Sequence, residues 1–571
     1  MGGYLQQALY EISVLGWFEE TVRPMVQGIV NAITRAHDNI QPGSVDLSVG
    51  ELLNTNINRS PASYLLNPKE ERSQYAYDVD KNMTVLGFRD KTGKGLGLIS
   101  WFAVHGVSVN ETNHLVNGDN KGYAAYITER TMNPSSISGK GRFVSAFAQS
   151  NEGDVTPNTL GSFCTGTTIP CDGSKNDKCP TGSSCNGRGP GWEISDYESN
   201  RIIGQQQADK AIELFKQEGH SLSGTIDFRN KFFDITTMVV NGSHLSAGTT
   251  DGPGLTSLGI YQNMTHGTPL WNIIKDILRT PTKEQEKCQA PKPILIDTGE
   301  ISFPFPWQPT VLEIQLFRLG DVFITSTPSE LTTMSGRRLR RAIKSRLESH
   351  GFSVQDVIYS GPANGYASYC TTYEEYQEQR YEGASTPYGE HTLEAYIEAF
   401  YELVDVMANG TSIASVALPD YTSKAFSLAP PDFTDHPLLL HKFGDVLTDV
   451  NTTSVYKSGQ TVKAVFVAGN PRNNVMLDST YLTVEQLVPY SGGKYRNGKW
   501  KVIRTDNDWD TRFRWKSVSK LLGMSKATIE WDIDDTVKAG TYRLGYFGHH
   551  RNDLSQQVTP HQGYSSIFTV Q

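Results

Sequence analysis

The chain has 571 residues, enough for two to four domains at about 100–200 residues each, which excludes a single small module. Its 52 Lys and Arg residues against 61 Asp and Glu residues give a net charge of −9. Nucleic acid is bound by neutralising phosphates with Lys and Arg, so it is not expected as the main partner. Hydrophobic residues at 37% and aromatic residues at 10% can form a large core and exclude a mostly disordered chain.

Neither a membrane span nor an export signal is predicted at the start of the chain. No stretch of the sequence approaches the about 18 consecutive apolar residues that a membrane-spanning helix needs. A secretory signal is not predicted, because a basic start is missing and Glu11 and Glu19 lie beside a short apolar stretch. Residues 5–36 instead place apolar side chains mostly at helical spacing, which predicts one or two amphipathic helices.

Strands and helices then mix through the first 400 or so residues. Strands are predicted at 45–52, 84–90, 95–105 and 309–328, and the third is a nearly continuous apolar run suited to a buried sheet. Helices are predicted at 120–131, 197–217, 335–349 and 391–407. This mixture predicts a mixed α/β catalytic domain over residues 1–408.

After Asn409 the sequence changes in character. A Pro-rich stretch is followed by short segments of alternating polarity, separated by Gly, Asn and Asp. These segments include 461–469, 480–488, 499–506, 527–533, 540–549 and 565–570. The pattern is typical of an all-β sandwich of about 100–160 residues. We therefore predict a β-sandwich domain at residues 409–571.

The cysteines and sequons point to an extracellular protein. Four of the six cysteines lie in a stretch rich in Gly, Pro, Ser and Asn, which could not form a core of its own: Cys164, Cys171, Cys179 and Cys185. This is typical of a loop held by disulfides. A zinc ribbon is the alternative, but the spacing contains no Cys-x-x-Cys pair. Seven sequons are compatible with a glycosylated surface: Asn58, Asn82, Asn110, Asn241, Asn263, Asn409 and Asn451.

The short signatures of common hydrolases and nucleotide-binding enzymes are missing: there is no G-x-S-x-G, no H-E-x-x-H and no P-loop. Polar residues instead follow buried strands. His105 ends the apolar run 95–105, where a histidine can ligate a metal, act as a base, or be a core residue bound to the backbone. Glu330 lies between a predicted strand and helix, and Thr156 lies in the Gly/Pro turn 151–161.

Longer strings are more specific than these single residues. The chain contains, in order, NINRSPASYLLNP, LISWFAVHGVSVNETNHLVNGDNKGYA, SNEGDVTPN, ELTTMSGRRLR, TTYEEYQEQRYEGAST, TDNDWDTRFRW and YRLGYFGHHR. Over essentially its whole length it thereby resembles the neutral (alkaline) ceramidase family. The resemblance implies a zinc-dependent amidohydrolase that cleaves the N-acyl bond of ceramide to give sphingosine and a fatty acid. It also implies a mixed α/β catalytic domain followed by an immunoglobulin-like β domain.

The resemblance implies a zinc site made of His105, Glu330 and Tyr369. A slip to Tyr366 is the alternative for the tyrosine. Imidazole and carboxylate suit this borderline Lewis acid. A tyrosine binds as the phenolate when the ion lowers its pKa. Zinc would polarise the amide carbonyl and supply a hydroxide at neutral pH.

Three further residues are implied to act on the substrate. Arg59 and Tyr381 match family residues that line the site and can donate hydrogen bonds to a developing oxyanion. Thr156 stands where the family usually has serine. A threonine hydroxyl can still attack or donate a hydrogen bond, but its methyl group restricts χ1 and crowds the pocket. We therefore expect activity that is reduced rather than abolished.

The family's first zinc-binding region is a His-x-His segment, just before a Gly-Gly-Tyr that corresponds to Gly2, Gly3 and Tyr4. This chain begins at Met1, so we expect an N-terminally truncated catalytic domain that lacks one zinc ligand. The same truncation accounts for the lack of an export signal in a protein whose family and cysteines imply secretion or a cell-surface location. Three protein ligands can hold a catalytic zinc, although the loss should weaken binding.

The resemblance also implies a calcium site in the second domain, at Asp506, Asp508 and Thr511. Clustered carboxylates with a hydroxyl suit a hard cation. A charged β turn is the alternative, and the sequence does not decide between the two.

The family pattern pairs the first cysteine of the loop with the third and the second with the fourth. It thus implies that Cys164 is joined to Cys179 and Cys171 to Cys185. Cys288 matches a family disulfide cysteine whose usual partner is not found here. It is either unpaired or joined to Cys370.

The leading hypothesis is a ceramidase that acts on ceramide presented at a membrane or micelle surface. A second is a non-catalytic relative that binds ceramide or another lipid, because the first zinc segment is absent and Thr156 replaces serine. A third is an extracellular adhesion protein, which predicts partner binding by residues 409–571 alone.

Overall fold

A computed structural model of the chain forms two compact units. The first comprises Met1–Trp17, Gln41–Ala125 and Ser145–Leu428, and the second Phe18–Ile40, Tyr126–Val144 and Ala429–Gln571. The structure describes residues 8, 11, 14–171, 179–180, 182–240, 243–245, 280–292, 294, 296–428, 434–477, 479–489 and 498–571. The sequons at Asn241 and Asn263, and the Gly2, Gly3, Tyr4 segment, lie outside these residues. The domain boundary between residues 408 and 409 stays a prediction.

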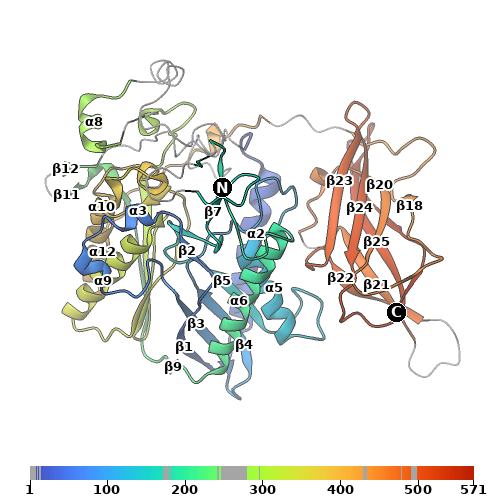
Figure 1. The fold of residues 1–571 in the computed structure, drawn as a ribbon, viewed down its shortest axis with the longest axis horizontal. Coiled ribbons are helices and arrows are strands. Elements are labelled where there is room, and N and C mark those ends of the chain that lie inside the picture. The colour runs from blue at the N-terminus through green and yellow to red at the C-terminus, as the bar shows by residue number, and fades with distance from the viewer. Residues whose placement is uncertain are drawn as a thin grey trace. The chain divides into compact units, whose positions relative to one another are not determined.

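The first unit contains two larger sheets (Figure 1). One has the strand order β5 (Val144–Ala148), β4 (Gly95–Trp101), β3 (Asn82–Asp90), β1 (Gly43–Glu51) and β9 (His220–Ser221). The other has the order β10 (Ile226–Asp234), β13 (Val311–Leu319), β14 (Val322–Ser326) and β16 (Asp356–Tyr359). Strands β14 and β16 are parallel, whereas β10, β13 and β14 pair antiparallel.

Helices cover the outer faces of these sheets. Helix α6 (Asp196–Lys216) contacts β1 and β3, and α9 (Thr333–Ser349) and α12 (Thr392–Ala408) pack on each other and on the second sheet. Leu316 of β13 and Tyr359 of β16 share a core with α9 and α12, whereas Ile358 shares one with Leu47 of β1. Because alternate residues of a strand face opposite sides, the two sheets pack on each other and the unit has α–β–β–α layers.

Short elements complete the first unit. Helix α5 (Asp119–Met132) begins in it and packs beside α6, where Gly204 allows close approach to Asn120 and Tyr123. The short helices are α3 (Pro61–Tyr64), α4 (Lys69–Arg72), α8 (Lys283–Gln289), α10 (Tyr373–Tyr376) and α11 (Tyr381–Ala384). The two-stranded pairs are β2 (Ile57–Asn58) with β6 (Val155–Thr156), β7 (Ser162–Cys164) with β8 (Cys185–Gly187), β11 (Val239–Val240) with β12 (Ser243–His244), and β15 (Glu330–Leu331) with β17 (Tyr369–Cys370).

The second unit is a β sandwich with helix α2 (Glu19–Asp38) and the end of α5. One sheet has the order β18 (Val446–Thr448), β20 (Thr461–Ala468), β24 (Met524–Asp532) and β23 (Thr511–Ser519). The other has the order β19 (Val455–Tyr456), β27 (Phe568–Val570), β25 (Gly540–Arg551), β21 (Leu482–Pro489) and β22 (Gly498–Thr505), with β26 (Val558–Tyr564) beside β25. Trp531, Phe466 and Tyr542 are buried in the shared core.

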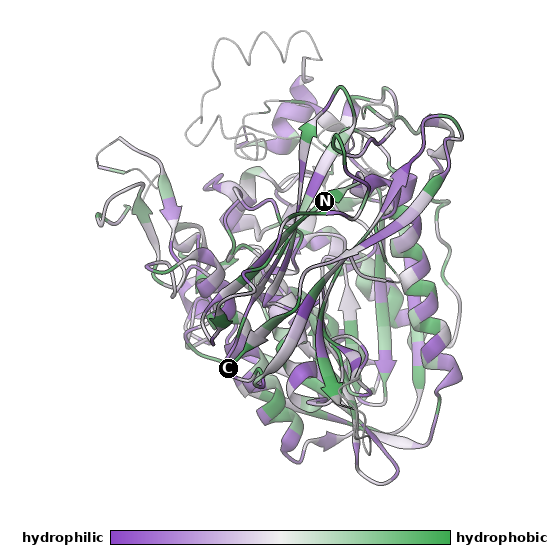
Figure 2. Cartoon of the chain, turned by 90° about the vertical axis from the view of Figure 1, so that its right-hand side faces the viewer, coloured by the Kyte–Doolittle hydropathy of each residue, from purple (hydrophilic) through white to green (hydrophobic). Residues whose placement is uncertain are grey.

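The predicted fold class is confirmed, because α/β layers occupy the first unit and a β sandwich the second. Figure 2 shows that individual strands and helices carry both hydrophobic and hydrophilic residues. In β24, for instance, every second residue is buried, as the alternating sequence 527–533 predicts. The predicted strand 95–105 is longer than β4, which ends at Trp101: the amide of Phe102 still bonds to Ala148 O of β5, but that of His105 bonds to Val155 O outside this sheet. The predicted strand 309–328 forms the two antiparallel strands β13 and β14.

The cysteine loop is held as the family resemblance implies. Disulfides join Cys164 to Cys179 and Cys171 to Cys185. Cys288 and Cys370 are both thiols, so they are not joined to each other. Among the described residues, no helix is long and apolar enough to cross a membrane.

The sequons are not all on the surface. Asn82, Asn110, Asn409 and Asn451 are exposed. Asn58 is buried, and its amide nitrogen donates to Asp154 Oδ2 at 2.9 Å and to Asp78 O at 3.0 Å. A glycan therefore has no access to Asn58 in the folded protein, and the expectation of a surface sequon there is wrong.

Candidate active site

A parallel pair of short strands brings two of the predicted ligands together. Glu330 of β15 lies in register with Tyr369 of β17, and the amide of Glu330 donates to Ser368 O at 2.8 Å. The two side chains are buried, with exposed fractions of 7% and 5%. Glu330 follows the turn after β14, which places it at the end of the second sheet.

His105 joins this pair from the first sheet. Its Nε2 lies 2.9 Å from Glu330 Oε2 and 3.4 Å from Tyr369 Oη. Its Nδ1 donates to Val155 O at 2.8 Å. The carbonyl acceptor fixes the tautomer and the ring orientation, so Nε2 is directed at the carboxylate and the phenol.

The Glu330 carboxylate is strongly held in its ionised form. Burial alone would raise its pKa, but hydrogen bonds from His105 and Tyr366 lower the pKa to about 2. Tyr366 Oη donates to Oε1 at 2.8 Å, on the oxygen that His105 does not use. Burial raises the pKa of Tyr369 well above its ordinary value, so this phenol is neutral near pH 7 in the metal-free protein.

Arg59 forms the cationic side of the site. It follows β2, and its Nη2 donates to Tyr369 Oη at 3.2 Å and to Gly153 O at 2.8 Å. Its guanidinium lies 5.1 Å from the centre of the Tyr381 ring, which is set edge-on to the Tyr369 ring at 5.3 Å. Tyr381 is 39% exposed, so it borders the site on the solvent side.

Glu382 holds Arg59 in place and was not predicted from the sequence. Its carboxylate is almost fully buried and accepts from Arg59 Nε at 2.8 Å and from Ser60 Oγ at 2.6 Å. Burial lowers the pKa of Arg59, but Tyr369 and Glu382 outweigh this and raise it, so the guanidinium stays charged. Glu382 directly follows the predicted residue Tyr381, which could have drawn attention to it. Its partner Arg59, however, lies 323 residues away in the chain.

Thr156 lies beside these residues through the backbone. The antiparallel pair β2 and β6 sets Thr156 opposite Ile57, two residues before Arg59, and the preceding residue Val155 accepts the bond from His105. Thr156 is 7% exposed, and its Oγ1 accepts from Asn158 N at 3.3 Å. The structure thus brings the six predicted zinc and substrate residues into one region.

Two further buried carboxyl groups lie in the turn before Thr156. Asp154 accepts from Thr333 N and Oγ1, both at 2.7 Å, at the start of α9. Burial and the charge of Glu375 raise the pKa of Asp154 to about 8. Burial and Glu330 raise the pKa of Glu152, whose Oε2 has no hydrogen-bond partner among the described residues. The sequence indicated only a turn here, because burial is not visible in it.

Of the predicted calcium residues, Asp506 and Asp508 lie in the loop between β22 and β23 of the second unit, and Thr511 is the first residue of β23. Asp506 Oδ2 accepts from Tyr481 N, and Asp508 Oδ2 from Thr505 N, both at 2.8 Å. Thr511 Oγ1 donates to Thr505 O at 2.7 Å. Within the described ranges no three His, Cys, Asp or Glu side chains form a group that could hold a metal. These bonds are those of a charged turn, and calcium binding there stays a prediction.

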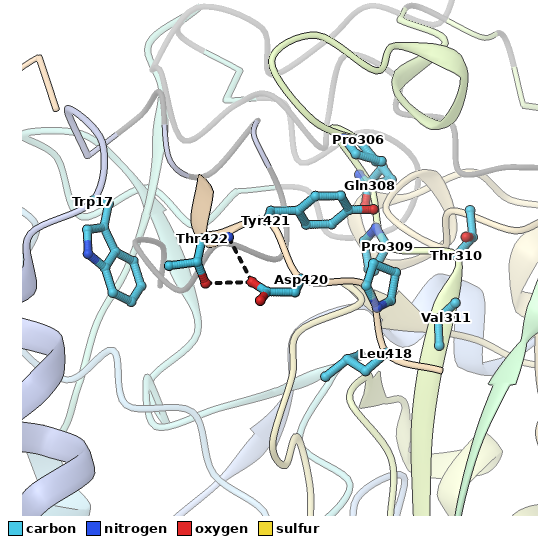
Figure 3. A pocket seen from close by; sticks show the side chains of 11 residues that line it. Trp17, Pro306, Gln308, Pro309, Thr310, Val311, Leu418, Asp420, Tyr421 and Thr422 are labelled. Carbon is cyan, nitrogen blue, oxygen red and sulfur yellow. Dashed lines mark hydrogen bonds between the residues drawn. The ribbon is translucent and has the colours of Figure 1, made fainter. Parts of the chain in front are cut away.

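A cavity of about 230 Å³ lies elsewhere in the first unit (Figure 3). Its lining includes Trp17, Leu418, Asp420 and Tyr421, and none of the predicted zinc or substrate residues. Asp420 Oδ1 accepts from Thr422 N at 2.9 Å, and Tyr421 stacks on Phe305 at 5.3 Å. The cavity is therefore a separate feature from the His105 region.

Family models match almost the whole chain. The model of the N-terminal part of neutral/alkaline non-lysosomal ceramidases matches residues 1–398, and the model of the C-terminal part matches residues 400–570. The chain belongs to the neutral/alkaline non-lysosomal ceramidase family. The resemblance seen in the sequence strings is thereby confirmed, and the protein is a member of an enzyme family.

Individual relatives agree with this assignment. Neutral ceramidase B of Dictyostelium discoideum is 42% identical to this chain over 597 residues, covering 100% of the chain and 80% of the relative. The crystal structure of neutral ceramidase from Pseudomonas aeruginosa is 34% identical, with a TM-score of 0.84 over 100% of this chain and 83% of that one. A ceramidase structure complexed with C2 also has a TM-score of 0.84 and 34% identity, covering 100% of this chain and 84% of that one.

Proposed function

We propose that the protein hydrolyses the N-acyl bond of ceramide and releases sphingosine and a fatty acid, with a zinc ion held by His105, Glu330 and Tyr369. Family membership supports the reaction. The observation that carries the assignment to this site is the convergence of His105 Nε2, Glu330 Oε2 and Tyr369 Oη from three separate segments.

The donor set fits zinc. Ligand atoms on a tetrahedral zinc with bonds of about 2.0 Å are about 3.3 Å apart. The distances from His105 Nε2 to Glu330 Oε2 and to Tyr369 Oη, 2.9 and 3.4 Å, bracket this value. The backbone acceptor for His105 Nδ1 and the Tyr366 donor to Glu330 Oε1 are the kind of outer partners that orient metal ligands. When bound, zinc would supply Lewis acidity and a nucleophilic water at neutral pH.

The chain's own residues then orient the substrate. Arg59 is fixed by Glu382 and presents its guanidinium to the Tyr369 side of the site, where it stabilises negative charge that develops on the amide oxygen. Tyr381 borders the site and donates a second hydrogen bond to that oxygen. Thr156 provides a hydroxyl that holds or attacks the amide, at a position where its methyl group limits rotation.

We also propose that the protein works outside the cell, on ceramide presented by a membrane or micelle. The two disulfides support an oxidising compartment, since such bonds are rare in the cytosol. The exposed sequons Asn82, Asn110, Asn409 and Asn451 offer positions for glycans there. Mass spectrometry of the secreted protein would identify the glycans and the disulfide-linked peptides.

Metal analysis and a fluorescent-ceramide assay on the purified chain test the proposal. We expect bound zinc, turnover to the fluorescent fatty acid, loss of turnover on treatment with a chelator, and recovery on return of zinc. Absence of both zinc and turnover would overturn the proposal. Ceramide binding without turnover would instead favour the non-catalytic lipid-binding function.

A further inference from the structure

The main chain turns directly after His105, and the first two residues of α5 hold this turn. Asp119 accepts hydrogen bonds from Ser108 N through Oδ1 and from Val109 N through Oδ2, both at 3.0 Å. Asn120 Nδ2 donates to His105 O at 2.8 Å and to Ser108 Oγ at 3.0 Å. Two adjacent side chains thereby bind three backbone polar groups of this turn, His105 O, Ser108 N and Val109 N.

These two residues are themselves rigidly placed. Asn120 is fully buried, and its Oδ1 accepts from Gln207 Nε2 of α6 at 3.1 Å. Asp119 has φ of +51°, a left-handed conformation that costs free energy for a residue other than glycine. Its amide donates to Asn117 Oδ1 at 2.8 Å, and its Oδ1 also accepts from Asn120 N at 2.7 Å. Hydrogen bonds with the neighbouring residues Asn117 and Asn120 thus maintain the uncommon backbone conformation of Asp119.

The constraint reaches the His105 ring. The backbone amide and the ring Nδ1 of His105 both donate to Val155 O, at 3.3 and 2.8 Å. Its carbonyl accepts from Asn120. Ring, amide and carbonyl are therefore fixed from two sides, so the position of Nε2 depends on α5 as well as on β6.

We propose that Asp119 and Asn120 are positioning residues for His105, which they hold at the distance that the Glu330 carboxylate requires. The metal-related part of this inference rests on the proposed zinc function. The alternative is that the two residues only stabilise the start of α5, in which case their loss lowers stability and leaves His105 unchanged.

The chain offers a matched control at the other end of the same helix. Asn133 follows α5, and its Nδ2 donates to Glu129 O at 2.9 Å and to Phe143 O at 2.8 Å. Its Oδ1 accepts from Phe143 N at 3.0 Å. Asn133→Ala therefore removes a comparable set of side-chain to backbone bonds, without touching the turn after His105.

The experiment compares Asn120→Ala and Asn133→Ala with the unaltered protein in three measurements. The first is hydrogen exchange of the backbone amides of residues 106–110 in the metal-free protein. The second is a Co²⁺ titration, which gives the ligand-field spectrum and the metal affinity. The third is the ceramide assay, which measures kcat and KM separately. We expect Asn120→Ala to speed exchange in this segment, weaken Co²⁺ binding about 10–100-fold and lower kcat more than KM, since outer-shell partners have effects of that size. Asn133→Ala should change none of the three.

Asp119→Asn serves as a milder variant in case Asn120→Ala does not fold. Asparagine keeps one acceptor oxygen and tolerates the left-handed conformation, so it should fall between the unaltered protein and Asp119→Ala in exchange and in Co²⁺ affinity. Unchanged exchange at 106–110 in Asn120→Ala, or an equal loss of Co²⁺ affinity in Asn133→Ala, would overturn the inference. If the unaltered protein neither binds metal nor cleaves ceramide, the proposed function fails, and the exchange comparison still decides whether α5 holds the turn.

Discussion

His105 Nε2 lies 2.9 Å from Glu330 Oε2, although the two residues are 225 positions apart in the chain. Both ring nitrogens of His105 face oxygen acceptors, Val155 O and the Glu330 carboxylate. Because the pKa of Glu330 is lowered to about 2, its carboxylate is ionised above that pH and can only accept hydrogen bonds. Tyr369, the third proposed ligand, is a neutral phenol near pH 7, because burial raises its pKa well above the ordinary value.

Metal binding should consequently release a proton. Tyr369 would bind zinc as the phenolate, so zinc affinity should rise as pH rises. Glu330 contributes no further proton above about pH 4. Calorimetric titration of zinc in two buffers of different ionisation enthalpy measures the protons released. Zinc binding with no proton release would contradict this arrangement.

Replacing Glu330 by alanine should abolish activity. The change removes the carboxylate that His105 and Tyr366 contact, and with it a proposed zinc ligand. We expect loss of bound zinc and a fall in kcat/KM of at least about a hundredfold, as found when metal-site partners are removed. Glu313→Ala is the control, because Glu313 lies in β13 and bonds to Asn364 instead. Turnover retained by Glu330→Ala would show that this residue is not a ligand.

Replacing Thr156 by serine should raise activity. Thr156 is buried, and its methyl group restricts χ1 of the hydroxyl. Serine keeps the hydroxyl and frees its rotation, so we expect an increase in kcat of up to about tenfold, equivalent to about 1.4 kcal/mol in the barrier. Thr156→Val, which keeps the shape and lacks the hydroxyl, should lose activity. A lower rate in Thr156→Ser would mean that the site is adapted to threonine.

Replacing Glu382 by glutamine should weaken catalysis through Arg59. The guanidinium would lose a charge-assisted hydrogen bond, a type of interaction that contributes about 1.5–3 kcal/mol, so kcat/KM should fall about 10–100-fold. Glu485→Gln in the second unit breaks a similar, largely buried pair with Arg543 and is the matched control. If both variants lose the same thermal stability and only Glu382→Gln loses activity, the effect is local to the site.

The stability of the first unit should depend on Asp80 in acid. Burial alone would raise the pKa of Asp80, but Arg340 and Arg337 lower it from 3.8 to about 2. A carboxyl whose pKa falls on folding stabilises the fold above its unfolded pKa and loses this contribution as pH falls. The shift corresponds to about 2 kcal/mol in the free energy of unfolding.

Unfolding curves of the unaltered protein and of Asp80→Asn at pH 6 and pH 3 test this. The difference between the two proteins should be largest at pH 6 and shrink toward pH 2. Asp209→Asn on the exposed side of α6 is the control, because among the described residues its carboxylate bonds only to the nearby Gln205. A difference that stays constant with pH would show that Asp80 does not titrate in this range.

Much of the fold follows from local sequence patterns. The helices at 196–216, 333–349 and 392–408 lie within two residues of their predicted limits. The 3.6-residue apolar period that predicts a helix can be recognised within a short stretch of sequence. Six strands of the second unit, β20, β21, β22, β24, β25 and β27, follow equally from alternation. Family strings also determined the disulfide pairing and named the residues that the structure groups around His105.

Other features depended on tertiary structure, since they join residues that are far apart in the sequence. Only the fold sets Glu382 against Arg59 and directs Asn120 at the carbonyl of His105. Burial decided that the Asn58 sequon is closed to glycans and that Asp154 has a raised pKa, because desolvation depends on what surrounds a side chain. The sequence by itself determined the element types and the family and named the candidate site residues, and the packed structure decided the distances between them, their charges and the residues that hold them.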